Sequence, residues 1–160
     1  MRIILFIGVI LCVVGFPLYH LVRQNLTGGI TNHGDYLAVD LKAMGFFEMN
    51  PQNASVDDVP AKYRALDGKR VGLEGFMYST TQAGDMISEW QLVYNIQKCC
   101  FNGPPKAQER VFSATRDGKM VDYAGGMVRM IGTLHVNVKK DAVGNISSVY
   151  TMDVEKVEAL

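Results

Sequence analysis

The chain has 160 residues, 48% of them hydrophobic and 20% charged, and its formal net charge at pH 7 is zero. This length suits one globular domain with an additional apolar segment. A general nucleic-acid binder normally carries a basic patch or stripe, so the charge balance argues against that class. We expect no nucleic-acid partner.

Residues 3–22 form the apolar segment and contain no lysine, arginine, aspartate or glutamate. About 20 residues at ~1.5 Å each match the ~30 Å hydrocarbon core of a bilayer. The run lacks the small-residue cleavage site of a signal peptide, and Leu11 is too bulky for a lipoprotein site at Cys12. We expect an uncleaved single transmembrane helix within residues 1–23, which includes Ile3, Val9 and Val22.

The next segment, residues 24–66, is expected to be a tether followed by an extended N-terminal stretch. Residues 24–34 are polar and rich in glycine, which favours flexibility. Apolar and polar side chains alternate over residues 36–43, which predicts a half-buried strand or an extended segment lying on the domain. Residues 60–65 can hold one helical turn.

Residues 67–160 show repeated strand signals separated by turns. Alternation at period two occurs in four regions, namely 71–77, 90–96, 110–115 and a C-terminal hairpin with its turn at Gly144-Asn145. On the strand at 90–96 we expect Trp90 and Leu92 to be buried. Glycines inside the strands suit the sharp bends that close a barrel, and they are Gly72, Gly75 and Gly132. The predicted fold is mainly β: a small OB-like closed or partly open barrel, with a β-sandwich as the alternative.

Adjacent cysteines and a proline-rich turn follow the strand at 90–96. Successive strand side chains face opposite ways, so the two thiols cannot both enter one core from a regular strand. Three interpretations stay open: one packed and one loop-facing free cysteine, which we favour, a strained vicinal disulfide, or a soft-metal site. The special loop contains Cys99, Cys100, Phe101, Gly103, Pro104 and Pro105.

Residue-level support for catalysis is missing from the sequence. It contains no phosphate-binding loop, GxSxG, HExxH or haem-attachment motif. Its histidines, His20, His33 and His135, are far apart, and its methionines suit core filling. We expect no enzymatic activity, no catalytic residue and no cofactor.

Four stretches resemble an uncharacterised bacterial family of exported or membrane-anchored proteins, known as a domain of unknown function. They are LDGKRVGLEGFMYS, LVYNIQKCCFNGPPKAQERV, VRMIGTLHV and VYTMDVEKVE, and the resemblance covers about residues 59–158. It implies an OB-like, non-enzymatic domain and supplies no catalytic residue.

These observations predict a membrane-anchored accessory or stabilising subunit that acts by protein–protein contact. It would be a single-pass protein of the bacterial inner membrane, with its globular domain on the periplasmic side. Its partners would be the lipid bilayer and an integral membrane complex of respiratory, photosynthetic or transporter type. The alternative function is periplasmic copper, zinc or thiol handling through Cys99 and Cys100.

Overall fold

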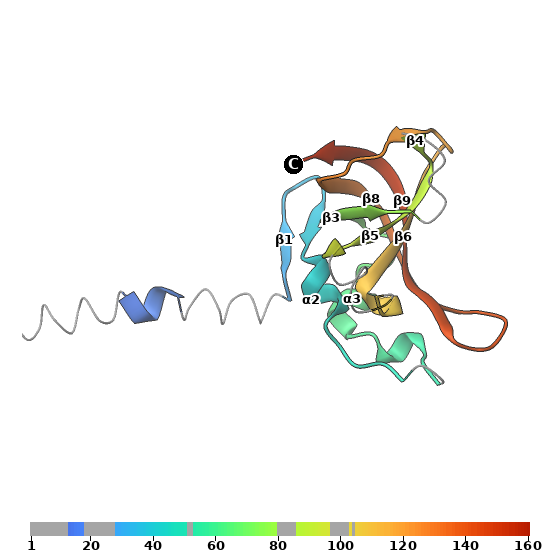
Figure 1. The fold of residues 1–160 in the computed structure, drawn as a ribbon. Helices are drawn as coiled ribbons and strands as arrows, with labels where there is room; N and C mark the ends of the chain where they lie inside the picture. The colour runs from blue at the N-terminus through green and yellow to red at the C-terminus, as the bar shows by residue number, and fades with distance from the viewer. Residues whose placement is uncertain (1–12, 18–27, 51–52, 80–85, 97–102, 104) are drawn as a thin grey trace, which may run out of the picture.

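The computed structural model describes residues 13–17, 28–50, 53–79, 86–96, 103 and 105–160 (Figure 1). Short helices join a set of strands, and this confirms the prediction of a mainly β domain. The strands are β1 (Ile30–Asn32), β2 (Leu37–Val39), β3 (Arg70–Tyr78), β4 (Met86–Ile87), β5 (Glu89–Val93), β6 (Arg110–Thr115), β7 (Val121–Asp122), β8 (Met127–Lys140) and β9 (Ile146–Ala159). The helices are α2 (Leu41–Gly45) and α3 (Ala61–Arg64), with 3₁₀ turns η1 (Val56–Asp58) and η2 (Ala107–Glu109).

Five of these strands pair in a closed ring. Strand β3 is antiparallel to β5, which is antiparallel to β6, and β6 lies parallel to β9. Strand β9 is antiparallel to β8, and β8 pairs with β3 to close the barrel. Closure satisfies backbone donors and acceptors that an open sheet would leave at its edges.

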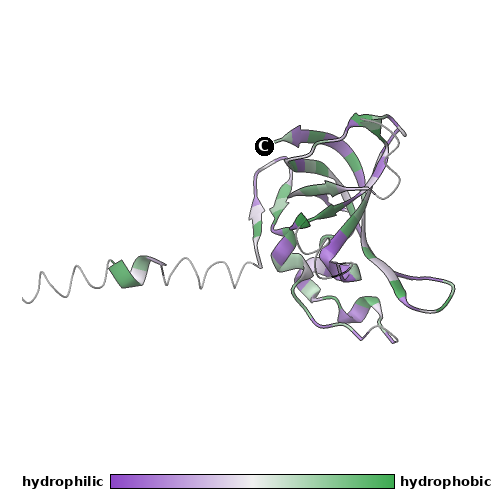
Figure 2. Cartoon of the chain, viewed as in Figure 1, coloured by the Kyte–Doolittle hydropathy of each residue, from purple (hydrophilic) through white to green (hydrophobic). Residues whose placement is uncertain are grey.

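The barrel core is filled by the alternate residues of these strands. Trp90 is 4% exposed and Leu92 is fully buried, as predicted for the central strand. In β9, Tyr150, Met152 and Val154 face the same interior. Hydrophobic and hydrophilic colours accordingly alternate in bands along the strands in Figure 2. The period-two pattern therefore fixes which side of each strand is buried.

Two strand glycines mark places where backbones approach closely. A Cβ at Gly75 would lie 2.7 Å from the carbonyl oxygen of Val93. A Cβ at Gly132 would lie 2.2 Å from the carbonyl oxygen of Asp153, next to a register shift in the β8–β9 ladder. Both positions require the absence of a side chain.

The strand predicted over residues 36–43 is wrong in its second half. Strand β2 ends at Val39, and the chain turns directly into α2. The cause is Asp40, whose carboxylate accepts backbone hydrogen bonds from Lys42 at 2.9 Å and Ala43 at 3.2 Å. An aspartate in this position caps a helix and competes with continued extension.

The segment before residue 67 contributes directly to the folded body. Strand β2 lies parallel to β3 and β1 pairs with β2, so part of the expected tether is in the sheet. The helices α2 and α3 lie next to the barrel strands (Figure 1). Their apolar side chains share the barrel core, and with neighbouring residues they supply Leu41, Met44, Val59, Tyr63 and Leu66.

Tyr63 fastens the N-terminal segment to α2. Its hydroxyl contacts two carbonyl oxygens, those of Gly28 at 3.0 Å and Ala43 at 2.9 Å. Burial, with a contribution from the charge of Asp40, raises the pKa of Tyr63. The hydroxyl therefore keeps its proton and stays a donor at neutral pH.

Tyr63→Phe is expected to lower the free energy of unfolding by about 1–3 kcal/mol, because the Gly28 and Ala43 carbonyls lose the one buried O–H donor that they share. Urea denaturation measures this loss. Tyr78→Phe is the matched control, since within the described chain no hydrogen bond to the Tyr78 hydroxyl is found, and its cost should be within about 0.5 kcal/mol. Equal losses in the two variants would contradict the fastening role of Tyr63.

The predicted transmembrane helix requires correction. Within the described residues, no helix combines the length and the apolar character needed to cross a bilayer. This finding contradicts both the expected anchor and the single-pass inner-membrane location that depended on it. The prediction relied on hydropathy, and an apolar composition alone does not establish a continuous membrane-spanning helix. Ile3, Val9 and Val22 lie outside the described residues.

Candidate functional site

The most exposed phenylalanine among the described residues lies at the C-terminal end of α2. Phe46 follows the helix directly and is 88% exposed. Its helix neighbours Leu41 and Met44 are buried in the core, so α2 is held firmly while Phe46 projects from its end. A large apolar side chain in water is informative when hollows surround it.

Two hollows border on Phe46, and we call them together with this side chain the Phe46 surface. One has a volume of about 510 Å³ and is lined by Lys42, Gly45, Phe46, Phe47, Glu48, Tyr94, Lys106, Gln108 and Glu109. The other has a volume of about 610 Å³ and is lined by Gly28, Asp40, Lys42, Ala43, Phe46, Pro60, Lys62 and Tyr63. Lys42 and Phe46 belong to both.

The described lining of the Phe46 surface carries both signs of charge, with the lysines Lys42, Lys62 and Lys106 and the carboxylates Asp40, Glu48 and Glu109. The carboxylate of Asp40 is engaged in capping α2, and Lys106 Nζ lies 3.9 Å from Glu48 Oε2. Lys62 Nζ lies 5.0 Å from the centroid of the Tyr63 ring. In the described part of the chain, no carboxylate lies within 4 Å of the Lys42 or Lys62 ammonium group. The surface therefore offers two cations beside an aromatic side chain.

The residues on either side of the special loop predicted from the cysteine pair belong to the Phe46 surface. Tyr94 precedes the loop and Lys106 follows it, and both line the same hollow beside Phe46. Cys99, Cys100, Phe101 and Pro104 lie outside the described residues. Gly103 is exposed with a φ of +82°, and Pro105 is half-buried. The three interpretations of the cysteine pair stay predictions.

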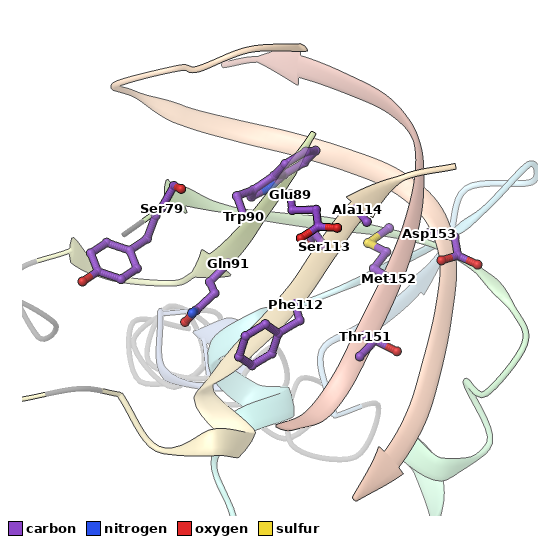
Figure 3. A pocket seen from close by; sticks show the side chains of 11 residues that line it. Ser79, Glu89, Trp90, Gln91, Phe112, Ser113, Ala114, Thr151, Met152 and Asp153 are labelled. Atoms are coloured by element: carbon purple, nitrogen blue, oxygen red, sulfur yellow. The ribbon is translucent and has the colours of Figure 1, made fainter. Parts of the chain in front are cut away.

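A separate hollow of about 280 Å³ lies on the barrel, and we call it the barrel hollow (Figure 3). Three of its residues lie side by side across neighbouring strands: Gln91 of β5 pairs with Phe112 of β6, which pairs with Thr151 of β9. The described residues that line it are Tyr78, Ser79, Glu89, Trp90, Gln91, Phe112, Ser113, Ala114, Thr151, Met152 and Asp153. The sequence did not predict this arrangement, because the three residues are far apart in the chain and only the strand register brings them together.

The predicted histidine candidates have different surroundings. His135 is half-exposed on β8, with Nε2 3.2 Å from Asp153 Oδ2 on β9. The His33 ring stacks on Tyr36 with centroids 5.4 Å apart. His20 lies outside the described residues. Within those residues, no group of three potential ligands that could hold a metal ion is found.

The fold and these two surfaces define a small β-barrel domain with hollows on its surface. The family profile described as "Protein of unknown function (DUF3299)" matches residues 40–159. The chain therefore belongs to the DUF3299 family. This confirms the predicted membership in a family of unknown function, although the match begins at Asp40, ahead of the stretch on which the resemblance was based.

The chain is also similar to a solved structure, that of a DUF3299 family protein from Pseudomonas aeruginosa PAO1. The identity is 22%, the TM-score is 0.50, and the match covers 75% of this chain and 73% of that one. At this identity the similarity concerns the fold. No curated protein matches the chain.

Proposed function

We propose that this protein is a non-enzymatic binding module, an accessory or stabilising subunit that contacts a partner protein through the Phe46 surface. The observation that carries the proposal is the 88% exposure of Phe46 between two hollows, on a helix that is itself fixed in the core. Aromatic side chains that project from a rigid support are frequent anchors of protein interfaces.

The energetics favour covering Phe46. Burying a phenylalanine side chain contributes about 1.5–3 kcal/mol relative to leaving it in water. The hollows beside it can accept apolar side chains from the partner. Lys42 and Lys62 add charge complementarity, so the partner segment should carry carboxylates next to its apolar residues.

We further propose that the barrel is OB-like. Numbered along the chain, its five strands are neighbours in the order first, second, third, fifth, fourth and back to the first, with the third and fifth parallel. This order supports the assignment. OB-like barrels present exposed faces and loops to ligands, which suits a module that works by binding.

Photocrosslinking tests the proposed contact. Phe46 is replaced with p-benzoylphenylalanine in the native host, and the adducts are identified by mass spectrometry. We expect one recurrent protein adduct at position 46. The matched control is the same replacement at Val143, an 85% exposed apolar residue of the turn between β8 and β9, where that adduct should be absent.

The identified partner then permits a quantitative test. Phe46→Ser should weaken its binding to the purified protein by about tenfold or more, the effect of losing 1.4 kcal/mol. Lys42→Glu should weaken it further as the salt concentration falls, because repulsion is then less screened. The proposal would be refuted if photocrosslinking from position 46 gave only the uncrosslinked monomer. It would also be refuted if positions 46 and 143 gave the same adducts.

A further inference from the structure

The barrel hollow has the geometry of a second binding site, independent of the Phe46 surface. Its floor contains two rows of side chains that run across β5, β6 and β9 (Figure 3). One row is Gln91, Phe112 and Thr151, and the other is Glu89, Ala114 and Asp153. Strands lie ~4.8 Å apart, so each row is roughly 10 Å long. Such a length matches a short oligomeric ligand lying across the strands.

Phe112 is held in place at the centre of this face. The Arg110 guanidinium carbon lies 5.2 Å from the Phe112 ring centroid, a cation–π distance. The same guanidinium donates to Gln91 Oε1 at 3.4 Å through Nη1 and to the Ser147 carbonyl at 3.2 Å through Nη2. The contact with Gln91 orients that amide so that its NH₂ group points away from Arg110. An aromatic platform and an oriented amide therefore exist before any ligand binds.

The charge of the barrel hollow restricts the class of ligand. Among the described residues, its lining includes the carboxylates of Glu89 and Asp153 and no lysine, arginine or histidine, while Arg110 and His135 contact Phe112 and Asp153 from outside this lining. Faces that bind single-stranded nucleic acid combine aromatic side chains with a positively charged groove. The carboxylates would repel phosphates and other anions.

We propose that the barrel hollow binds a short neutral oligosaccharide. The apolar C–H face of one sugar ring would lie on Phe112, and its hydroxyls would donate to Glu89 and Asp153. Gln91 and Thr151 supply further hydrogen-bonding groups in the adjacent row. The small side chain of Ala114 between the two carboxylates leaves room for the ring. OB-like barrels use the corresponding second and third strands to bind oligonucleotides and oligosaccharides, and the two carboxylates here disfavour the anionic oligonucleotides.

Titration by ¹H–¹⁵N NMR tests this proposal, with maltotriose, cellotriose and triacetylchitotriose as probes. At least one should shift the amide signals of β5, β6 and β9 in a saturable manner. Phe112→Ala should weaken its binding by about tenfold or more, since stacking on the ring is lost. Thr151→Val, which keeps the side-chain shape, should weaken saccharide binding several-fold. This second variant provides the test if Phe112→Ala does not fold.

Phe46→Ala is the matched aromatic control and should leave saccharide binding unchanged, which separates this proposal from the protein-binding function. Any of three outcomes would overturn the saccharide proposal. One is the absence of saturable shifts with all three probes. Another is binding that persists unchanged in both Phe112→Ala and Thr151→Val. Tighter binding of pentalysine than of every saccharide at the same residues would also overturn it.

Discussion

Leu92→Ala is expected to lower the free energy of unfolding by about 2–5 kcal/mol. Leu92 is fully buried on β5, with Met77 of β3 and Val111 of β6 as its cross-strand partners. Truncation removes apolar contact and leaves a cavity, because the ring of paired strands cannot contract around it. Urea denaturation followed by tryptophan fluorescence and circular dichroism measures the loss.

The neighbouring Gln91→Ala is the control for this prediction. Gln91 lies on the opposite side of the same strand, is half-buried in the barrel hollow, and receives one long hydrogen bond from Arg110. Its replacement should change stability by no more than about 0.5 kcal/mol. Small and equal effects at positions 91 and 92 would mean that the inward face of β5 is wrongly assigned.

Gly132→Ala is expected to cost about 3 kcal/mol or more, at or above the upper end for overpacking. The new Cβ would lie 2.2 Å from the Asp153 carbonyl oxygen and 2.9 Å from the Val154 Cα, and both of these are backbone atoms. A flexible side chain could move aside, whereas here the β8–β9 ladder itself must shift. The expected loss appears in thermal and urea unfolding.

Gly126→Ala provides the comparison, because nothing lies within 4 Å of a Cβ at that position and its φ is not positive. That variant should be neutral or slightly stabilising, since alanine restricts the unfolded chain more than glycine. A neutral result for Gly132→Ala would contradict the close approach of β8 and β9.

Local patterning accounts for the parts of the fold that the sequence predicted well. Strand β6 has the predicted bounds, Arg110–Thr115, and Trp90 and Leu92 of β5 are buried as predicted. Both features follow from side chains that alternate at period two, which is a property of a few consecutive residues. The helical turn predicted over residues 60–65 is also a local feature, and α3 (Ala61–Arg64) confirms it.

Features that depend on distant residues were not predictable in this way. Helix α2 has five residues, little more than one turn of about 3.6 residues, so the apolar pattern does not repeat and only its Asp40 cap could have indicated it. The exposure of Phe46 depends on how α2 packs against the barrel. The barrel hollow depends on the register that joins Gln91, Phe112 and Thr151 from three strands. The expected membrane-spanning helix was also wrong, since no described helix is long and apolar enough to cross a bilayer, and an apolar composition alone does not specify one.

The closing ladder between β3 and β8 also sets an order of events during synthesis of the chain. Arg70 pairs with Thr133, and β6 receives its second neighbour only from β9. Contacts so distant in sequence form slowly because the chain loses loop entropy first. The β8–β9 hairpin is local by contrast, and its turn is organised by the Asp141 carboxylate, which accepts from the Val143 and Asn145 amides at 2.9 Å.

A nascent chain that has emerged only as far as β6 therefore holds strands whose edges have no neighbour. Unpaired edges are templates for association with other chains. The ribosome delivers the remaining strands at roughly 5–20 residues per second, whereas a hairpin forms in about 1–10 μs. Completion of the barrel during translation thus waits for delivery of β8 and β9, and a chain truncated after β6 should aggregate where the full chain folds.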